Sequence, residues 1–293
     1  MAKKLLLLAV IVVTLIVAVV GIALLYPAMQ PQSIQPQSTQ PQAQDASEIL
    51  QSSKSAVENL DSMTADAYFS QYFDIESIKI NSRYTMQLEL LRSKGMKINF
   101  EDYEYECSGE EEQVATEKLM QEEIKESLNN AWILDKNDKL YFYAPFISEE
   151  NVTEFAPRPS LLRYNDIIIT TDTLCLAIPI TDPLHLALLF DHAENATYEG
   201  IETVNVGNTP VEAYVVSYKF RDPTIKFMDK ADLRTWISTA DYMPLKTESS
   251  ATHSYGTTTM KINFEFGFHS YEMNAFIPPE NLSLPENLKV IPR

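Results

Sequence analysis

The strictest pattern in the sequence is the alternation of apolar and polar residues over residues 258–268, which leaves little freedom in how this segment can fold. Five apolar side chains occupy every second position: Met260, Ile262, Phe264, Phe266 and Phe268. A period of two places successive side chains on opposite faces of a strand. The segment is therefore predicted to be a strand in a sheet with one apolar face and one solvated face.

The same alternation recurs in three earlier segments, 65–73, 84–90 and 96–100. Short turn sequences separate further pairs of β-type segments at Asp135–Asp138, Gly207-Asn208 and Ala240-Asp241. Asn, Asp and Gly at such positions favour tight hairpin connections. Strands that follow one another through hairpins pair antiparallel, so the sequence predicts an antiparallel meander.

Three helices are predicted among these strands. Asp45, with Glu48 three residues later, has the form of a capping box, and apolar residues at helical spacing continue to about Asp61. The acidic segment from Glu110 to about Asn130 carries a thin apolar seam. Asp182-Pro183 is a cap followed by proline at the first helical position, which predicts a short helix over Leu184–His192.

The N-terminus predicts a membrane anchor. Residues 5–25 are uninterruptedly apolar and would form about 30 Å of helix, the thickness of a bilayer core. No small-x-small cleavage site follows, which favours an uncleaved signal anchor. Lys3 and Lys4 precede the span and the next basic residue is Lys54, so residues 1–4 are expected in the cytoplasm and the rest outside the cell membrane.

A Gln/Pro-rich linker, residues 26–45, separates this anchor from the predicted β domain, residues 46–293. It contains the five-residue repeat QPQSI QPQST QPQAQ, which has no apolar face and favours extended backbone. Fully extended, it would reach roughly 50 Å. Its expected role is to hold the domain away from the membrane.

Composition argues against several functions. A net charge of −18 opposes nucleic-acid binding, which needs clustered Lys and Arg. None of the 7 glycines forms a phosphate-binding loop or a nucleophile elbow, so no cofactor and no enzymatic activity is predicted. His185 and His192 share a helix face and could form half a metal site, but no third ligand is recognisable and no metal is predicted.

Covalent modification is suggested at two kinds of residue. Cys107 and Cys175 are either one disulfide of an oxidising compartment or two free thiols, and the spacing does not decide between them. Three Asn-x-Ser/Thr sequons make glycosylated surface loops a further expectation: Asn151, Asn195 and Asn281.

The order of the elements resembles the lipoprotein-carrier superfamily of the LolA, LppX/LprG and RseB type, over roughly residues 46–285. The motifs that carry the resemblance are Leu60–Asp66, Asp138–Pro145, Asp182-Pro-Leu, Tyr198–Val204, Thr209–Val216, Leu233–Ser238, Tyr242–Lys246 and Phe276–Pro279. The retained anchor and the acidic segment 110–130 depart from the family pattern. The resemblance implies an α+β fold in which an incomplete antiparallel β-barrel wraps around a few helices.

The resemblance also implies an apolar cavity for acyl chains inside the curved sheet. The residues predicted to line it are Phe69, Phe73, Tyr84, Met86, Leu88, Leu90, Phe142, Met260, Ile262, Phe264 and Phe266. The alternative is that these side chains fill an ordinary core. Two functions follow: a membrane-anchored carrier or chaperone for lipid or lipoprotein acyl chains, or a module that binds or senses envelope proteins without lipid cargo.

Overall fold

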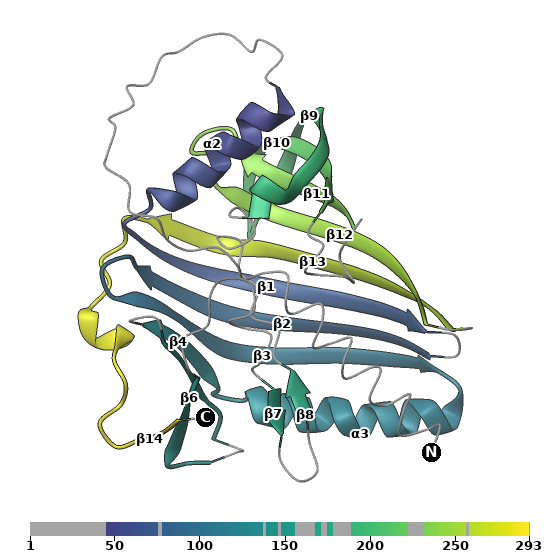
Figure 1. Ribbon diagram of the computed structural model, residues 1–293, viewed down its shortest axis with the longest axis vertical. Coiled ribbons are helices and arrows are strands. Elements are labelled where there is room, and N and C mark those ends of the chain that lie inside the picture. Colours follow the sequence, from purple (N-terminus) through teal and green to yellow (C-terminus); the bar gives the residue numbers. More distant parts are fainter. Residues whose placement is uncertain are drawn as a thin grey trace.

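The computed structural model describes residues 45–75, 78–136, 139–145, 148–155, 168–170, 175–177, 189–221, 231–255 and 258–292. Within these ranges the chain forms one open, curved, twelve-stranded sheet, a separate two-stranded sheet and two α-helices (Figure 1). The predicted α+β class with an incomplete barrel is confirmed at this level, because the sheet curves but does not close.

The predicted anchor 5–25 and most of the linker lie outside the described residues. No helix within the described ranges has the length and apolar character needed to cross a bilayer.

The helices are α2 (Ala46–Glu58) and α3 (Glu111–Leu128), with the short 3-10 helices η3 (Leu189–His192) and η4 (Pro279–Leu282). The first six strands are β1 (Ser62–Ile75), β2 (Ile78–Leu91), β3 (Gly95–Gly109), β4 (Trp132–Lys136), β5 (Lys139–Tyr143) and β6 (Asn151–Phe155). The next five are β7 (Ile168–Thr170), β8 (Cys175–Ala177), β9 (Ala193–Val206), β10 (Thr209–Phe220) and β11 (Asp232–Ser238). The last three are β12 (Pro244–Tyr255), β13 (Thr258–Met273) and β14 (Lys289–Pro292).

The large sheet consists of two meanders joined side by side. Its strand order is β14-β6-β5-β4-β3-β2-β1-β13-β12-β11-β10-β9, so strands β1 to β6 and strands β9 to β13 each pair with their neighbours in sequence. The predicted meander is thereby confirmed. The two halves join where β1 pairs antiparallel with β13, and β14 adds a parallel strand beside β6.

Register places the apolar positions of neighbouring strands in common rows. Phe69 lies opposite Tyr84 of β2 and opposite Phe266 of β13. Since residues opposite one another share a face of the sheet, the alternating apolar residues of the three strands form one continuous inner face.

Two helices lie at opposite ends of this inner face. Asp45 caps α2 by accepting a hydrogen bond from the Ser47 amide at 3.1 Å. Arg92 fixes the other end, where it donates to the carbonyls of Leu60 and Val57 at 2.8 and 2.9 Å. The main sheet contacts of α2 are with β9 and β10, whereas those of α3 are with β3 (Figure 1).

The strands extend beyond the predicted segments. β3 continues through the acidic residues to Gly109, and its inward positions change from even to odd numbers between Phe100 and Tyr103. A bulge causes this change, because Thr85 of β2 pairs with Asp102 and Met86 with Phe100, which leaves Glu101 without a partner. Beyond the bulge, Tyr103 faces inward while Glu104 is exposed. Of the helix predicted over Leu184–His192, only Leu189–His192 is described, and it is a 3-10 helix.

Candidate functional site

The candidate site is the middle of the inner face, which we call the inner strip. It comprises Phe69 and Phe73 of β1, Tyr84, Met86 and Leu88 of β2, and Ile262, Phe264 and Phe266 of β13, all of them buried. Of the other predicted lining residues, Phe142 of β5 is buried in the same cluster and Leu90 is half-buried against it. The side chain of Met260 lies outside the described residues.

Aromatic rings dominate the strip. The ring of Phe69 lies 6.0 Å from those of Tyr84 and Phe264 and 6.2 Å from that of Phe266, measured between centroids. Tyr84 in turn lies 4.7 Å from Tyr103 of β3. The eight residues of the strip therefore share one buried face. Their role as the lining of a lipid cavity stays a prediction.

A buried polar network borders the strip on its β3 side. Gln121 of α3 donates to the Glu117 carboxylate at 2.6 Å and accepts a hydrogen bond from the Tyr103 hydroxyl. Across the sheet, the Gln71 amide donates to the Tyr84 hydroxyl at 2.8 Å. Burial raises the pKa values of both Tyr84 and Tyr103, so the phenols are neutral hydrogen-bonding groups.

The ionisable groups near this network favour their uncharged forms. Burial raises the pKa of the Glu117 carboxyl, and the hydrogen bond from Gln121 offsets part of the rise. Burial, followed by the nearby Glu117, raises the pKa of the Cys107 thiol to about 11. This end of the inner face is therefore polar but not positively charged.

Cys107 carries a free, half-buried thiol on β3. The side chain of Cys175 lies outside the described residues, so a disulfide between the two stays a prediction. The three sequons also stay predictions. Asn151 and Asn195 are exposed, whereas the Asn281 amide donates to the Glu89 carboxylate at 2.7 Å.

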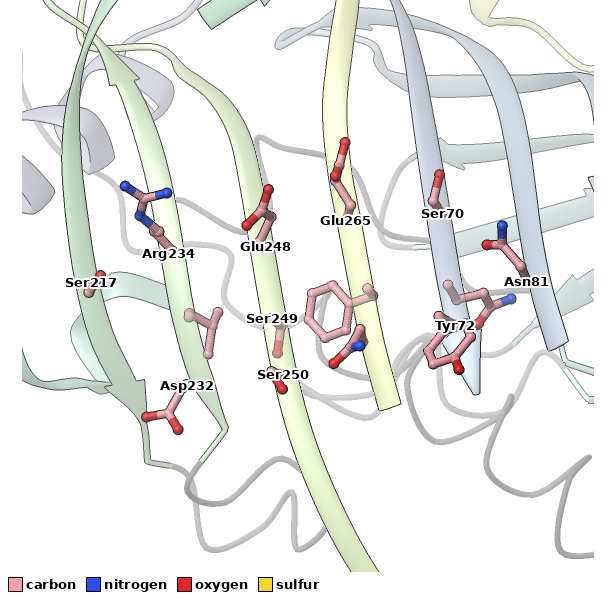
Figure 2. Close-up of a pocket in the computed structure, with 14 residues that line it drawn as sticks. Ser70, Tyr72, Asn81, Ser217, Asp232, Arg234, Glu248, Ser249, Ser250 and Glu265 are labelled. Atoms are coloured by element: carbon pink, nitrogen blue, oxygen red, sulfur yellow. The ribbon is translucent and has the colours of Figure 1, made fainter. Parts of the chain in front are cut away.

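The outer face of the same strands carries a shallow, open hollow of about 540 Å³. It crosses strands β10, β11, β12, β13, β1 and β2 and is lined mainly by polar side chains. Figure 2 shows Arg234, Glu248, Glu265 and Ser70 side by side on four neighbouring strands. Its lining also includes Gln71, Ser249 and Phe264, which alternate with the outward residues along the same strands.

Charges on the outer face are paired with their neighbours. Arg234 donates to Glu199 and Glu202, both at 2.7 Å, and its guanidinium lies 4.5 Å from the centre of the Trp236 ring. The Ser217 hydroxyl and then Arg234 lower the pKa of Glu199. Lys246 reaches Glu248 at 2.8 Å and Glu265 at 3.2 Å. Each of these two cations is therefore paired with two carboxylates.

Sequence reasoning missed the polar members of the inner face. Gln71 occupies an apolar position in the alternation over 65–73, and this position could have predicted that its amide faces inward. The inward position of Tyr103 could not be predicted, because the bulge shifts the alternation along β3 by one residue. Glu117 and Gln121 lie in an acidic helix whose buried side cannot be told from its solvated side by composition.

The sequence matches no family model, and no curated protein matches it. Solved structures do match it, and some of them carry the name of the superfamily that the sequence resembles. A LolA superfamily protein from Nitrosomonas europaea is 10% identical, with 83% of this chain and 99% of that chain covered and a TM-score of 0.33.

LprF from Mycobacterium bovis is 11% identical, with 81% and 97% covered and a TM-score of 0.35. MucB in the Pseudomonas aeruginosa MucA/MucB complex is 11% identical, with 85% and 64% covered and a TM-score of 0.37.

Proposed function

We propose that the inner strip binds acyl chains of a lipid or lipoprotein, and that the protein acts as a carrier or chaperone without converting its cargo chemically. In this proposal residues 5–25 anchor the chain in the cell membrane. The linker 26–45 then holds the β domain on the extracytoplasmic side, within reach of lipids or of envelope proteins that carry them.

The observation that carries the proposal is a buried, uncharged strip placed between two helices. The eight side chains of the strip lie on β1, β2 and β13, whereas the main sheet contacts of α2 are with β9 and β10 and those of α3 with β3. Aromatic rings and Met86 adapt to flexible chains. Each methylene that leaves water for such a surface contributes about 0.8 kcal/mol.

A second candidate is a module that binds an envelope protein. β9 is the last strand in the sheet order, so one edge of its backbone has no strand partner among the described residues. Ile201 in the middle of this strand is 48% exposed. An extended segment of another protein could add to such an edge by main-chain hydrogen bonds.

Photocrosslinking with the full-length chain in phosphatidylcholine nanodiscs tests the first candidate. The probes are palmitic acid bearing a diazirine in its chain and the glycerol ester of the same acid. Tryptic cleavage separates the strip from the anchor, because β1, β2 and β13 fall mainly in peptides 55–79, 84–92 and 262–289.

With either probe, we expect label in these three peptides, reduced by an excess of unlabelled monooleoylglycerol or oleate. Asn263→Ala, at an exposed outer-face position of β13 that keeps the tryptic site at Lys261, is the matched control and should leave the labelling unchanged. Label confined to residues 5–25, or spread over all surface peptides, would refute lipid binding by the strip and favour the second candidate.

A further inference from the structure

Unpartnered polar atoms mark one row of the inner face. Gln71 is 2% exposed and Ser249 is 5% exposed, yet Gln71 Oε1 and Ser249 Oγ have no hydrogen-bond partner. A third such atom, Ser53 Oγ, lies on α2 away from this row. Buried polar groups are nearly always paired, so two orphans on one face call for an explanation.

Strand register places Gln71 and Ser249, the two residues with unpartnered atoms, on one row. Ser249 of β12 lies opposite Phe264 of β13, and Phe264 lies opposite Gln71 of β1. Neighbouring strands are about 4.8 Å apart, so Gln71 and Ser249 stand roughly 10 Å apart on one row with the Phe264 ring between them. We call these three residues the polar row.

The Gln71 amide is held in place at one end only. That end is Nε2, which donates to the Tyr84 hydroxyl at 2.8 Å, and Tyr84 also interacts with Tyr103 and Ser82. Turning the amide around would exchange its oxygen and nitrogen, but one end would still lack a partner. The row therefore offers a positioned amide and a hydroxyl group to a neutral partner.

The charges around the row disfavour an anion. The buried polar side chains of the described residues include no Lys or Arg, and their one carboxyl group is Glu117. A phosphate or carboxylate entering this face would lose its hydration without gaining a cation. Arg234 lines the outer-face hollow together with residues of the row, but it is already paired with Glu199 and Glu202. Lys261 is exposed on the outer face of β13.

We propose that the polar row binds the uncharged polar group of a lipid, the hydroxyl or ester of a mono- or diacylglycerol, while its acyl chains lie on the inner strip. The row then selects neutral lipids over anionic phospholipids with the same chains. This inference rests on the proposed function and names the class of cargo.

Competition between two lipids that differ only in the head group tests the inference. The full-length chain in nanodiscs is labelled with the photoreactive glycerol ester, and dioleoylglycerol or dioleoylphosphatidate is added as competitor. We expect dioleoylglycerol to halve the labelling of peptides 55–79 and 262–289 at a content about tenfold lower than dioleoylphosphatidate. Equal competition by the two lipids would overturn the inference.

The double variant Gln71→Met, Ser249→Ala assigns the selectivity to the row. It removes both unpartnered atoms at nearly constant volume, so we expect it to fold, to be labelled, and to lose most of the tenfold preference. Ser250→Ala, the outward neighbour, is the matched control and should keep it. A double variant that retains the preference would overturn the inference, even if its thermal stability changes, because the atoms would then serve folding or hold water.

The two proposals fail in different ways. Absence of label from the strip peptides with both probes refutes lipid binding itself. Label that is present but competed equally by both lipids refutes only the selection of neutral cargo by the polar row.

Discussion

The inner and outer faces of β1, β2, β12 and β13 are built from alternate residues of the same strands, yet they differ in chemistry. The inner face is buried, aromatic and without basic side chains, and its unpaired groups are a neutral amide and a hydroxyl. The outer face pairs Arg234 and Lys246 with carboxylates on neighbouring strands. The comparison teaches that the period of two alone can give one sheet a buried aromatic face and a charged outer face.

The largest expected effect comes from truncating the centre of the inner face. Phe266 is fully buried and contacts Phe69, so Phe266→Ala should lower the free energy of unfolding by about 3–5 kcal/mol. Lys261→Ala on the outer face of the same strand should change it by less than about 0.5 kcal/mol. Urea unfolding of both variants measures the difference, and similar costs would contradict the division between the faces.

A smaller effect is expected at the outer-face contact where Tyr68 covers Gly267. A Cβ added at Gly267 would come within 2.8 Å of Tyr68 Oη and 2.9 Å of two ring carbons. The ring also lies under Arg83, and the Tyr68 hydroxyl donates to Glu265 at 2.6 Å. Gly267→Ala should therefore cost about 1–3 kcal/mol. Gly267→Ala with Tyr68→Ala relieves the clash, and a cost that persists there would point to the backbone instead.

The buried carboxyl of Glu117 should make stability depend on pH. Burial raises its pKa above the unfolded value of 4.5, so the stability it contributes is present below that value and lost as the pH rises through the raised pKa. Glu117→Gln keeps an oxygen that accepts from Gln121 and carries no charge. We expect its Tm at pH 7 to exceed that of the wild type by a few degrees, with the gap closing toward pH 4.5. The exposed Glu104→Gln is the control, and a gap that is constant with pH would exclude titration of Glu117 as its cause.

The smallest effect is expected for the outer charges. Lys246 is held by Glu248 and Glu265, and these hydrogen bonds raise its pKa although burial alone would lower it. Lys246→Met should cost no more than about 1 kcal/mol, and less at high salt, because partly exposed ion pairs contribute little and are screened. Denaturation at low and high salt checks this. A larger cost that salt does not reduce would mean that the lysine stem packs on Trp236.

Much of the sheet could be predicted because alternation and turn residues are local signals. The segments 65–73, 84–90 and 258–268 all lie in strands, and Asp45 caps the first helix. The pairing of β1 with β13 depends on contacts between the two ends of the domain, which no local pattern contains. Tyr103 was missed because the bulge reverses the inward positions along β3, and the unpaired state of Gln71 depends on the register of three strands.

The junction of β1 and β13 bears on how the domain forms. Each meander can assemble from neighbouring hairpins, but this junction brings together segments that end at Ile75 and begin at Thr258. Closing so long a stretch of chain carries a large entropic cost, so the junction should form late in folding. Since Phe69 and Phe266 meet across it, the candidate lining would be complete only after that step. Cargo bound there would then slow unfolding by bridging the two halves.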